Sequence, residues 1–295
     1  MPVKVSHTID LGPELSNDVM KIARSQGEDP DRVCADIQEL RDMIFEKGDC
    51  IPARTDDAFL IRFLRARFFK VDNAYKLLCR YCEFREANPE LHVDVHPFLL
   101  NKLGEDDIVS VTPYRDQTGR RIMIYKFGNW RPSKIPIDDI FRASIILFEM
   151  GALEPQSQVL GGVGIFDLEG LSLNHVWYVT PTVAKKIISL MVTCMPVRTT
   201  AIHIVNNNWA FDMAYQMFKP FLNDRMRERI FIHGTDMSSL HKHINKENLP
   251  NKYGGDMPEF PFTKWMESLA KNEILMDELK RLGYTFDINE FDAFI

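Results

Sequence analysis

Two acidic residues are the first candidates for chemistry in this sequence. Asp167 and Glu169 alternate at the end of an apolar run and stand directly before Gly170. Paired carboxylates can transfer protons or hold a metal ion. Because no matching set of partner residues lies near them in the sequence, we interpret the two carboxylates as part of a structural turn.

The other reactive motifs point away from catalysis. Gly161, Gly162 and Gly164 precede a predicted strand, whereas a dinucleotide-binding loop follows its strand and opens a helix. No lysine of the Walker type follows these glycines, and neither Gly-x-Ser-x-Gly nor His-Glu-x-x-His occurs. His92 with His96, and His241 with His243, could bind a metal, but neither pair has a cysteine or a second histidine pair at zinc spacing, so we interpret them as loop histidines. Cys79 and Cys82 have the spacing of a redox pair but lie in the middle of a predicted helix, so we interpret them as core residues. We therefore predict no catalytic residue, no bound metal, no cofactor and no enzymatic activity.

Cationic side chains gather in one early stretch of the sequence. Arg62, Arg65, Arg67 and Lys70 lie within residues 58–71, which contain no acidic side chain. The same stretch is predicted to form an apolar helix, so the cations would lie beside hydrophobic side chains. This combination is typical of a protein that meets an anionic membrane surface.

A second basic group follows a proline. Pro220 can begin a helix at its first turn, and such a helix would place Arg225 and Arg229 one turn apart on one face. Arginine is suited to phosphate through its planar donor fork. Glu228 partly neutralises the group, so an ordinary solvated charge run is the alternative interpretation.

Two helical segments could enclose a ligand. In residues 137–148, Ser144 shares an apolar stripe with Phe141 and Phe148, so its hydroxyl either bonds back to its own helix or meets a ligand. In residues 209–222, apolar side chains recur at helical intervals. That segment is either a core helix or a movable lid.

Composition limits the class of protein. The chain has 295 residues, of which 45% are hydrophobic, and a net charge of −6, which argues against nucleic acid as a partner. The amino terminus lacks the apolar core of a signal peptide, and no apolar run approaches a membrane span. Five scattered cysteines are typical of reduced thiols. We expect a cytoplasmic protein, in which a local basic patch can still bind membranes.

The order of predicted elements indicates two domains and a tail. Residues 1–95 contain helical patterns at 31–45, after Thr55 or Asp56, and at 71–87. Residues 96–260 alternate β-branched runs with helices near 137–152, 181–194 and 209–222. This alternation predicts βαβ units and a mainly parallel sheet. Residues 261–295 form a helical tail.

Eight short motifs together resemble the CRAL-TRIO family of lipid-binding proteins, in particular its branch of tocopherol carriers, retinaldehyde carriers and clavesins. The likeness is ordered, covers roughly residues 30–256 and is highly specific as a set. The motifs are Phe-Leu-Arg-Ala-Arg at 63–67, Asp-Gln-Thr-Gly at 116–119, Phe-Asp-Leu-Glu-Gly at 166–170, Thr-Pro-Thr-Val-Ala-Lys-Lys at 180–186, Ile-His-Ile-Val-Asn at 202–206, Lys-Pro-Phe-Leu at 219–222, Arg-Ile-Phe-Ile-His-Gly at 229–234 and Leu-Pro-Asn-Lys-Tyr-Gly-Gly at 249–255.

The resemblance implies a helical amino-terminal domain packed on an α/β CRAL-TRIO domain, with an apolar cavity closed by a mobile lid at about 209–218. The lid would contribute Phe211, Tyr215 and Phe218. The family's other pocket positions fall on apolar residues with few exceptions, as a dry lipid cavity requires. They are Tyr125, Phe141, Ser144, Phe148, Phe166, Val179, Val183, Ile187, Leu190, Met191, Val197, Ile202 and Ile204.

The resemblance also implies a basic cleft for phosphoinositide phosphates. Its positions correspond to Arg67, Arg198, Arg225 and Arg229. A further family basic position holds Thr200 here, which bears on affinity or headgroup preference. Where the tocopherol carriers have a second pocket serine, this chain has Phe148, which makes the pocket less polar.

The function implied is that of an intracellular lipid transfer protein. It would bind one tocopherol- or retinoid-like molecule and release it at phosphoinositide-containing membranes. We expect a monomer that associates transiently with endosomal or plasma membranes. The alternatives are a retinoid carrier that sequesters its cargo without phosphoinositide exchange, an adaptor that binds small GTPases or membranes with an empty cavity, and an enzyme acting on the bound lipid.

Overall fold

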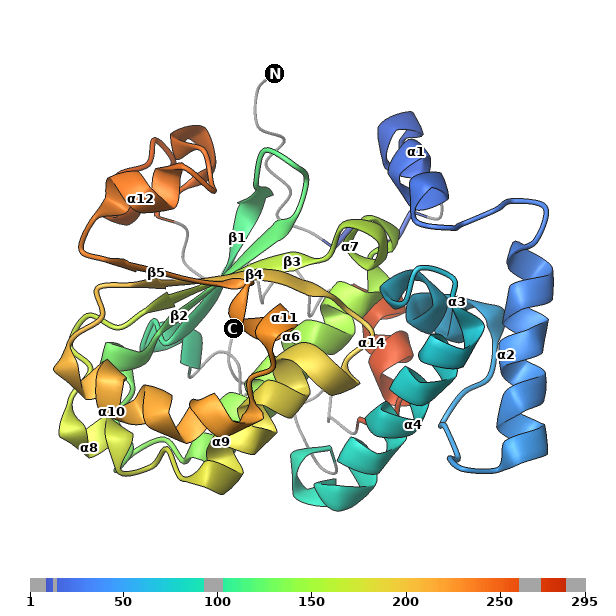
Figure 1. The fold of residues 1–295 in the computed structure, drawn as a ribbon, viewed down its shortest axis with the longest axis horizontal. Helices are drawn as coiled ribbons and strands as arrows, with labels where there is room; N and C mark the ends of the chain where they lie inside the picture. Colours follow the sequence, from blue (N-terminus) through green and yellow to red (C-terminus); the bar gives the residue numbers. More distant parts are fainter. Residues whose placement is uncertain (1–8, 13–14, 93–102, 260–271, 285–295) are drawn as a thin grey trace.

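A five-stranded sheet forms the centre of the molecule, with helices on both faces and a helical group beside it (Figure 1). The computed structural model describes residues 9–12, 15–92, 103–259 and 272–284. The domain boundaries expected at residues 95 and 260 lie outside these ranges. The division into domains therefore stays a prediction.

The amino-terminal helices follow the sequence pattern closely. They are α2 (Val33–Lys47), α3 (Asp57–Ala66) and α4 (Val71–Ala87). Helix α1 (Asn17–Ser25), for which no range was predicted, precedes them. Helix α3 begins where the Asp56 side chain accepts a hydrogen bond from the backbone N–H of the third residue that follows it. Helix α4 ends directly before the Asn-Pro pair that disfavours a further turn. The helices predicted in this region are confirmed.

The sheet has the order β1-β2-β3-β4-β5. Strands β1 and β2 are antiparallel, and all the other neighbours are parallel. The predicted α/β class with a mainly parallel sheet is therefore confirmed. The strands are β1 (Val109–Arg115), β2 (Arg121–Lys126), β3 (Gly162–Asp167), β4 (Thr199–Val205) and β5 (Ile230–Gly234).

The helices of the α/β part divide between the two faces of the sheet. The long helix α6 (Ile137–Leu153) and helix α9 (Pro181–Ile188) cover one face, and α12 (Met237–His241) lies over the other (Figure 1). The remaining helices are α7 (Pro155–Leu160), α8 (Leu173–Val176), α10 (Trp209–Phe218), α11 (Asp224–Arg227) and α14 (Glu273–Arg281), with the short 3-10 helices Pro89–Leu91, Phe127–Asn129, Lys219–Phe221, Lys246–Asn248 and Asn251–Tyr253.

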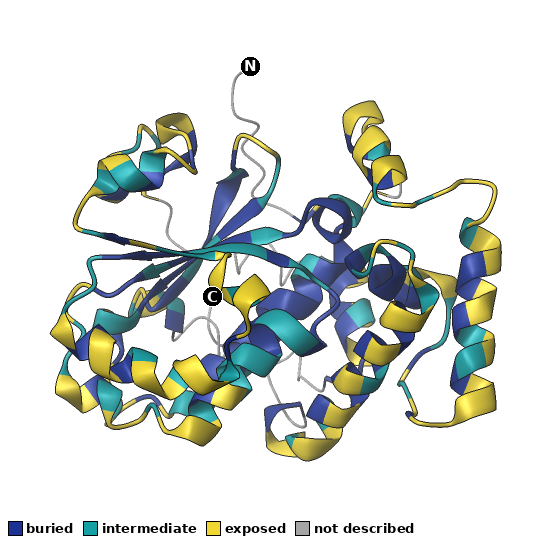
Figure 2. Cartoon of the chain, in the orientation of Figure 1, coloured by how far each residue is buried: buried dark blue, intermediate teal, exposed yellow. Residues whose placement is uncertain are grey.

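Alternation along each strand separates two hydrophobic cores. On β2, Ile122 and Ile124 pack with the α12 side, whereas Tyr125 joins the larger core on the α6 side. The larger core also contains buried side chains of α2, α3, α4 and α14. The helical group and the α6 face of the sheet therefore share one continuous core. Figure 2 shows buried segments on the strands, on α6 and on the helices of the helical group.

Two helix predictions differ from the structure. The segment predicted at 181–194 is α-helical only as far as Ile188, and Ser189–Cys194 continues as a π-helix. Pro220 lies inside the 3-10 helix Lys219–Phe221 and does not begin the next helix. Instead Asn223 caps α11 through its side chain. The prediction of a single helix that carries both Arg225 and Arg229 is therefore wrong, because the chain is extended at Leu222 and Asn223.

Candidate functional site

A cavity lies between the carboxyl ends of the parallel strands and the helices that cover them. It encloses about 940 Å³ of empty space, including the space at its mouth. Its wall is apolar apart from a few polar side chains. The lining consists of Tyr125, Phe127, Trp130, Ile137, Ile140, Phe141, Ser144, Phe166, Leu168, Leu171, His175, Val179, Ile187, Leu190, Met191, Ile204, Phe211, Ala214 and Phe218.

The polar side chains of the lining hydrogen-bond to protein. The Tyr125 hydroxyl donates to Ser144 Oγ at 2.9 Å, and Ser144 donates in turn to the carbonyl oxygen of Ile140 at 2.8 Å. Burial raises the pKa of the Tyr125 phenol to about 12, so the hydroxyl keeps its proton. Ser144 thus bonds to its own helix, and its oxygen retains limited capacity to accept a further bond.

His175 is fixed in the same wall. Its Nε2 lies 2.8 Å from the carbonyl oxygen of Trp130, and its Nδ1 lies 2.9 Å from Ser172 Oγ. The Trp130 indole N–H donates to the carbonyl of Ile135 at 2.8 Å. These bonds leave the polar atoms engaged with protein, so the cavity offers an incoming molecule mainly carbon.

The structure gathers most of the predicted pocket residues around this cavity but not all of them. Phe148 and Val197 line a neighbouring cavity instead, and Met191 lines both. Val183, Ile202 and Tyr215 are half-buried and pack against the core beside the cavity. No structural observation tests which of these side chains touches a ligand, so their binding role stays a prediction.

Helix α10 covers the cavity with one face and leaves the other in solvent. Phe211 and Ala214 are buried, whereas Trp209 is 59% exposed and Met213 is 48% exposed. Trp177, which directly follows the neighbouring helix α8, is 79% exposed. Figure 2 shows the outer sides of α8 and α10 as largely exposed. The sequence pattern found α10, but the exposed Trp177 was missed because an isolated aromatic residue has no periodic signal.

The two carboxylates considered first serve the fold. Asp167 is 1% exposed and accepts hydrogen bonds from Asn206 at 2.9 Å and from the Tyr253 hydroxyl at 3.0 Å. Lys252 pairs with Asp167 at 3.0 Å and with Glu169 at 3.3 Å. Burial alone would raise the pKa of Asp167, but the pKa is lowered because donors on Asn206, the Glu169 backbone and Lys252 favour the ionised form. The interpretation of a structural turn is confirmed.

Two arginines of the early cationic stretch are neutralised inside the protein. Arg62 is 3% exposed and pairs with Glu278 at 3.0 Å. Arg65 pairs with Glu28 at 2.6 Å. Neither guanidinium therefore faces solvent as a free cation, and the expectation of a membrane-facing stretch is wrong for both. Their partners are distant in the sequence, so no local pattern could reveal them.

Arg67 and Arg198, by contrast, belong to a group of cations at the amino-terminal edge of the parallel strands. Burial lowers the pKa of Arg67 to about 10, with further contributions from Arg80 and Arg229. Burial also lowers the pKa of Arg198 to about 10, with contributions from Arg120, Arg229 and Arg67. Within the described ranges, none of these five arginines has a carboxylate at ion-pairing distance. Such mutual repulsion favours a bound anion.

The backbone after Arg67 adopts an unusual conformation that helps to position the Arg198 guanidinium. Phe68 and Phe69 have φ values of 56° and 53°, in the left-handed region that side chains rarely adopt. The resulting turn places the Phe68 ring under the Arg198 guanidinium, 4.5 Å from its centroid. Arg198 also donates to Gln26 at 3.1 Å and to the Val159 carbonyl. The cation is therefore held in position.

The other cleft predictions fare differently. Arg229 is exposed, and its Nη1 donates to the Thr199 carbonyl at 3.4 Å. Arg225 is exposed on α11. Thr200 donates its hydroxyl to the Gly162 carbonyl at 2.9 Å, so it is used by the sheet. Arg80 and Arg120 were missed, since single arginines in mixed surroundings carry no sequence signal.

An apolar cavity enclosed between a mainly parallel sheet and a helical cover defines a class of protein that takes up hydrophobic molecules. The family model of the CRAL/TRIO domain matches residues 105–255, and that of the CRAL/TRIO N-terminal domain matches residues 30–80. The chain therefore belongs to the CRAL-TRIO family. Membership implies a lipid-binding transfer protein.

Similar proteins cover most of the chain. Clavesin-1 of Rattus norvegicus is 36% identical over 270 residues, which span 90% of this chain and 75% of that protein. Alpha-tocopherol transfer protein-like of Mus musculus is 34% identical over 260 residues, with 88% and 76% covered. The crystal structure of Sfh5 has a TM-score of 0.50 at 17% identity and covers 85% of this chain and 92% of that chain. This last similarity supports the fold alone.

No helix in the described ranges is long and apolar enough to cross a membrane.

Proposed function

We propose that this protein carries one tocopherol- or retinoid-like molecule in the cavity beneath α10 and releases it at phosphoinositide-containing membranes. The observation that carries the proposal is the position of α10. Its inner face closes an apolar cavity, and its outer face presents Trp209 and Met213 to solvent. One helix thus links the cargo site to a surface suited to a membrane interface.

The chemistry of the cavity supports a cargo with little polarity. Tyr125 and Ser144 already hydrogen-bond to each other, so a strongly polar ligand group would lose its bonds to water without replacement. Burying about 400 Å² of apolar ligand surface contributes roughly 10 kcal/mol before the costs of ordering. That gain is sufficient to retain a hydrophobic molecule during transport.

The arginine group supports release at an anionic surface. Phosphates of an inositol headgroup would relieve the repulsion among Arg67, Arg198 and Arg229. This scheme requires the membrane to contact both the arginines at the amino-terminal edge of the strands and the apolar outer side of α10 at their carboxyl ends. Opening of α10 would then free the cargo. In this scheme the protein associates with the membrane transiently and peripherally.

The identity of the cargo is tested by native mass spectrometry with organic extraction. The protein is purified from a eukaryotic host and also offered tocopherol, retinol, retinaldehyde and phospholipid in vesicles. We expect one hydrophobic molecule per chain, and its mass identifies the cargo. Protein that stays empty with every lipid would contradict the carrier function and favour an adaptor. Chemical conversion of a bound lipid would instead favour the alternative that the protein is an enzyme.

Membrane release is tested by charge reversal in the arginine group. We expect Arg67→Glu and Arg229→Glu each to slow transfer to vesicles containing phosphatidylinositol bisphosphate by about tenfold, since each removes a phosphate contact worth about 1–2 kcal/mol. Retention of ligand in solution should stay unchanged. The assay measures transfer of a fluorescent tocopherol analogue between donor and acceptor vesicles, with and without phosphoinositide.

Lys242→Glu is the matched control for this experiment. Lys242 is exposed beside α12, over the opposite face of the sheet, and its substitution changes the net charge equally. We expect the control to transfer at the normal rate. If the arginine variants also transfer normally, the arginine group does not bind the membrane. A carrier that sequesters its cargo without phosphoinositide exchange would then account for the cavity.

A further inference from the structure

A second cavity lies next to the first along the same face of the sheet. It encloses about 660 Å³ of empty space, including the space at its mouth. The first cavity lies over the carboxyl ends of the strands, and the second lies over their amino ends. Its lining consists of Ile9, Val111, Arg121, Met123, Leu147, Phe148, Gly151, Glu154, Ser157, Gly161, Gly162, Val163, Gly164, Met191, Val197, Arg198 and Thr199.

Glycines create this second space. On β3, Gly162, Gly164 and Phe166 lie at alternate positions and so share one face of the sheet. Phe166 fills that face at the first cavity, whereas the two glycines leave it bare at the second. Opposite them on α6, a Cβ added to Gly151 would meet no described atom within 4 Å. The glycines that do not form a phosphate-binding loop therefore leave room for the second cavity.

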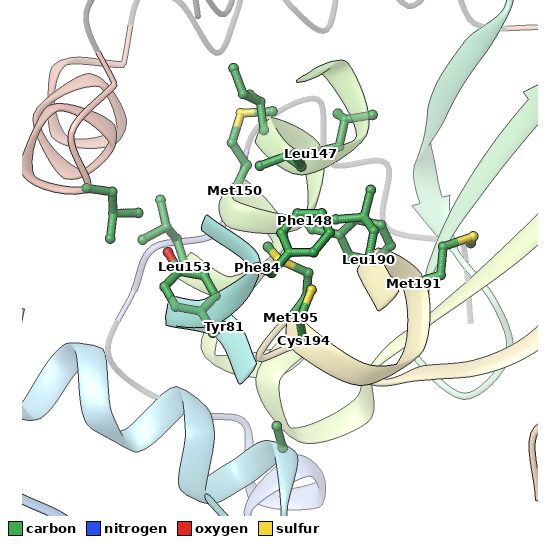
Figure 3. Packing of buried hydrophobic residues seen from close by; sticks show 14 of the residues in the cluster. Tyr81, Phe84, Leu147, Phe148, Met150, Leu153, Leu190, Met191, Cys194 and Met195 are labelled. Atoms are coloured by element: carbon green, nitrogen blue, oxygen red, sulfur yellow. The ribbon is translucent and has the colours of Figure 1, made fainter. Parts of the chain in front are cut away.

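Met191 separates the two cavities and lines both of them. It belongs to the π-helical segment Ser189–Cys194, and a Cβ added to Gly164 would lie 3.9 Å from its terminal methyl carbon. In Figure 3 the Met191 side chain extends toward the strands, with Phe148 and Leu190 beside it. Methionine is unbranched and adopts several rotamers at low cost. A flexible side chain therefore lies where the two cavities meet.

The charged residues at the far end of the second cavity already have partners. Glu154 pairs with Arg121 at 2.6 Å and with Arg115 at 2.9 Å, and it accepts a hydrogen bond from Ser157 at 2.6 Å. These bonds satisfy the Glu154 carboxylate within the protein. Arg198 and Thr199 also line this cavity, where they donate to the carbonyl oxygens of Val159 and Met191. The remaining wall is hydrocarbon and sulfur, which suits an apolar chain.

We propose that the two cavities form one lipid site divided by Met191, and that the second cavity receives the far end of a long apolar tail. The ring or head of the ligand would lie in the first cavity, and its linear isoprenoid or acyl tail would pass Met191. This inference rests on the proposed carrier function and adds a ligand class to it. The preferred cargo is a lipid with a long flexible tail, not a short or rigid one.

The test compares two probes that share one ring and differ in tail length. The probes are alpha-tocopherol and the chromanol that carries a methyl group in place of the phytyl tail. We expect wild type to bind the tailed probe far more tightly, because each buried methylene contributes about fourfold in affinity. Gly151→Leu fills the second cavity from a helical position that favours leucine over glycine. This variant should bind the tailed probe about tenfold more weakly or worse and the short probe as wild type does.

Two further variants complete the experiment. Gly164→Val fills the same cavity from the sheet, where its added Cβ makes only ordinary contacts, and should repeat the result. Asn73→Leu adds the same side chain to an exposed position of α4 and should change neither affinity. Thermal unfolding checks that each variant is folded.

The possible outcomes separate the two proposals. If folded Gly151→Leu and Gly164→Val bind both probes as wild type does, the second cavity holds no tail, and the carrier function stands. Equal loss of both probes in folded variants also contradicts the divided site, since the short probe does not reach the second cavity. If wild type binds neither probe, the proposed tocopherol-like cargo is wrong and the inference fails with it.

Discussion

Tyr125 and Ser144 are the polar pair at the centre of the ligand cavity. Each is buried, and together with the Ile140 carbonyl they form a short chain of hydrogen bonds. The chain holds the Tyr125 ring in place, where it also packs edge-on against Phe166 at 5.4 Å between centroids. At the scale of single residues, polar atoms here organise the wall of an apolar cavity.

The hydrogen bond of this pair leads to a stability prediction. Ser144→Ala leaves the buried Tyr125 hydroxyl without its acceptor, and we expect a loss of about 1–3 kcal/mol in the free energy of unfolding. Tyr125→Phe should cost less, because Ser144 keeps its bond to the helix. Urea denaturation of both single variants and the double variant gives the coupling energy. Additive losses would show that the pair does not interact.

Strands β4 and β5 place a histidine pair on the face away from the ligand cavity. His203 on β4 is 2% exposed, and its Nδ1 lies 3.0 Å from Nε2 of His233 on β5. Ser239 lies 2.9 Å from the other nitrogen of His233, and the rings of Phe231 and His243 pack against His203. The element-scale consequence is a buried, neutral imidazole between two parallel strands.

Acid should weaken these strands. Burial lowers the pKa of His203 to about 3, with further contributions from His233 and His243. The unfolded chain, with an ordinary histidine pKa near 6.5, therefore binds the proton more readily, and stability is lost as pH falls below that value. We expect His203 alone to account for about 2 kcal/mol between pH 7.5 and pH 5. Urea denaturation at both pH values should show a smaller loss in His203→Phe. An equal loss in the variant would mean that other groups cause the acid sensitivity.

At the scale of the whole molecule, α14 joins the helical group to the α/β part. Glu278 on α14 pairs with Arg54 at 2.7 Å and with the buried Arg62 at 3.0 Å. Nearby, Arg85 of α4 donates to the Leu282 carbonyl at 2.6 Å and lies 3.4 Å from the buried Glu149 of α6. Segments from the beginning, middle and end of the chain therefore meet in one network.

Removal of the Glu278 carboxylate should destabilise the whole fold. Glu278→Ala leaves the Arg62 guanidinium buried beside Arg54 without this counter-charge, and we expect a loss of about 3–5 kcal/mol. Asp277→Ala removes an exposed carboxylate from the same helix and should change stability by less than about 0.5 kcal/mol. Guanidinium chloride denaturation of both variants measures the difference. A similarly small loss of stability in both variants would show that the Glu278 ion pairs do not hold α14 in place.

Local signals in the sequence predicted the elements of this fold. The helical spacing of α2, the Asp56 cap of α3 and the Asn-Pro stop after α4 each act within a few residues. The β-branched runs and intervening helices likewise indicated a mainly parallel sheet. These features were predictable because backbone hydrogen bonds and amphipathic periodicity are set by neighbours in the chain.

The sequence by itself thus determined the α/β class, the helical cover and an apolar set of pocket positions. Only the tertiary structure decided which cations are free, because the carboxylate that neutralises Arg62 stands 216 residues away. It also decided the shape of the ligand space, because the second cavity needs glycines on β3 and on α6 to line the same void. Ion pairs and cavities depend on residues that are distant in the sequence and close in space, and no local sequence pattern predicts such contacts.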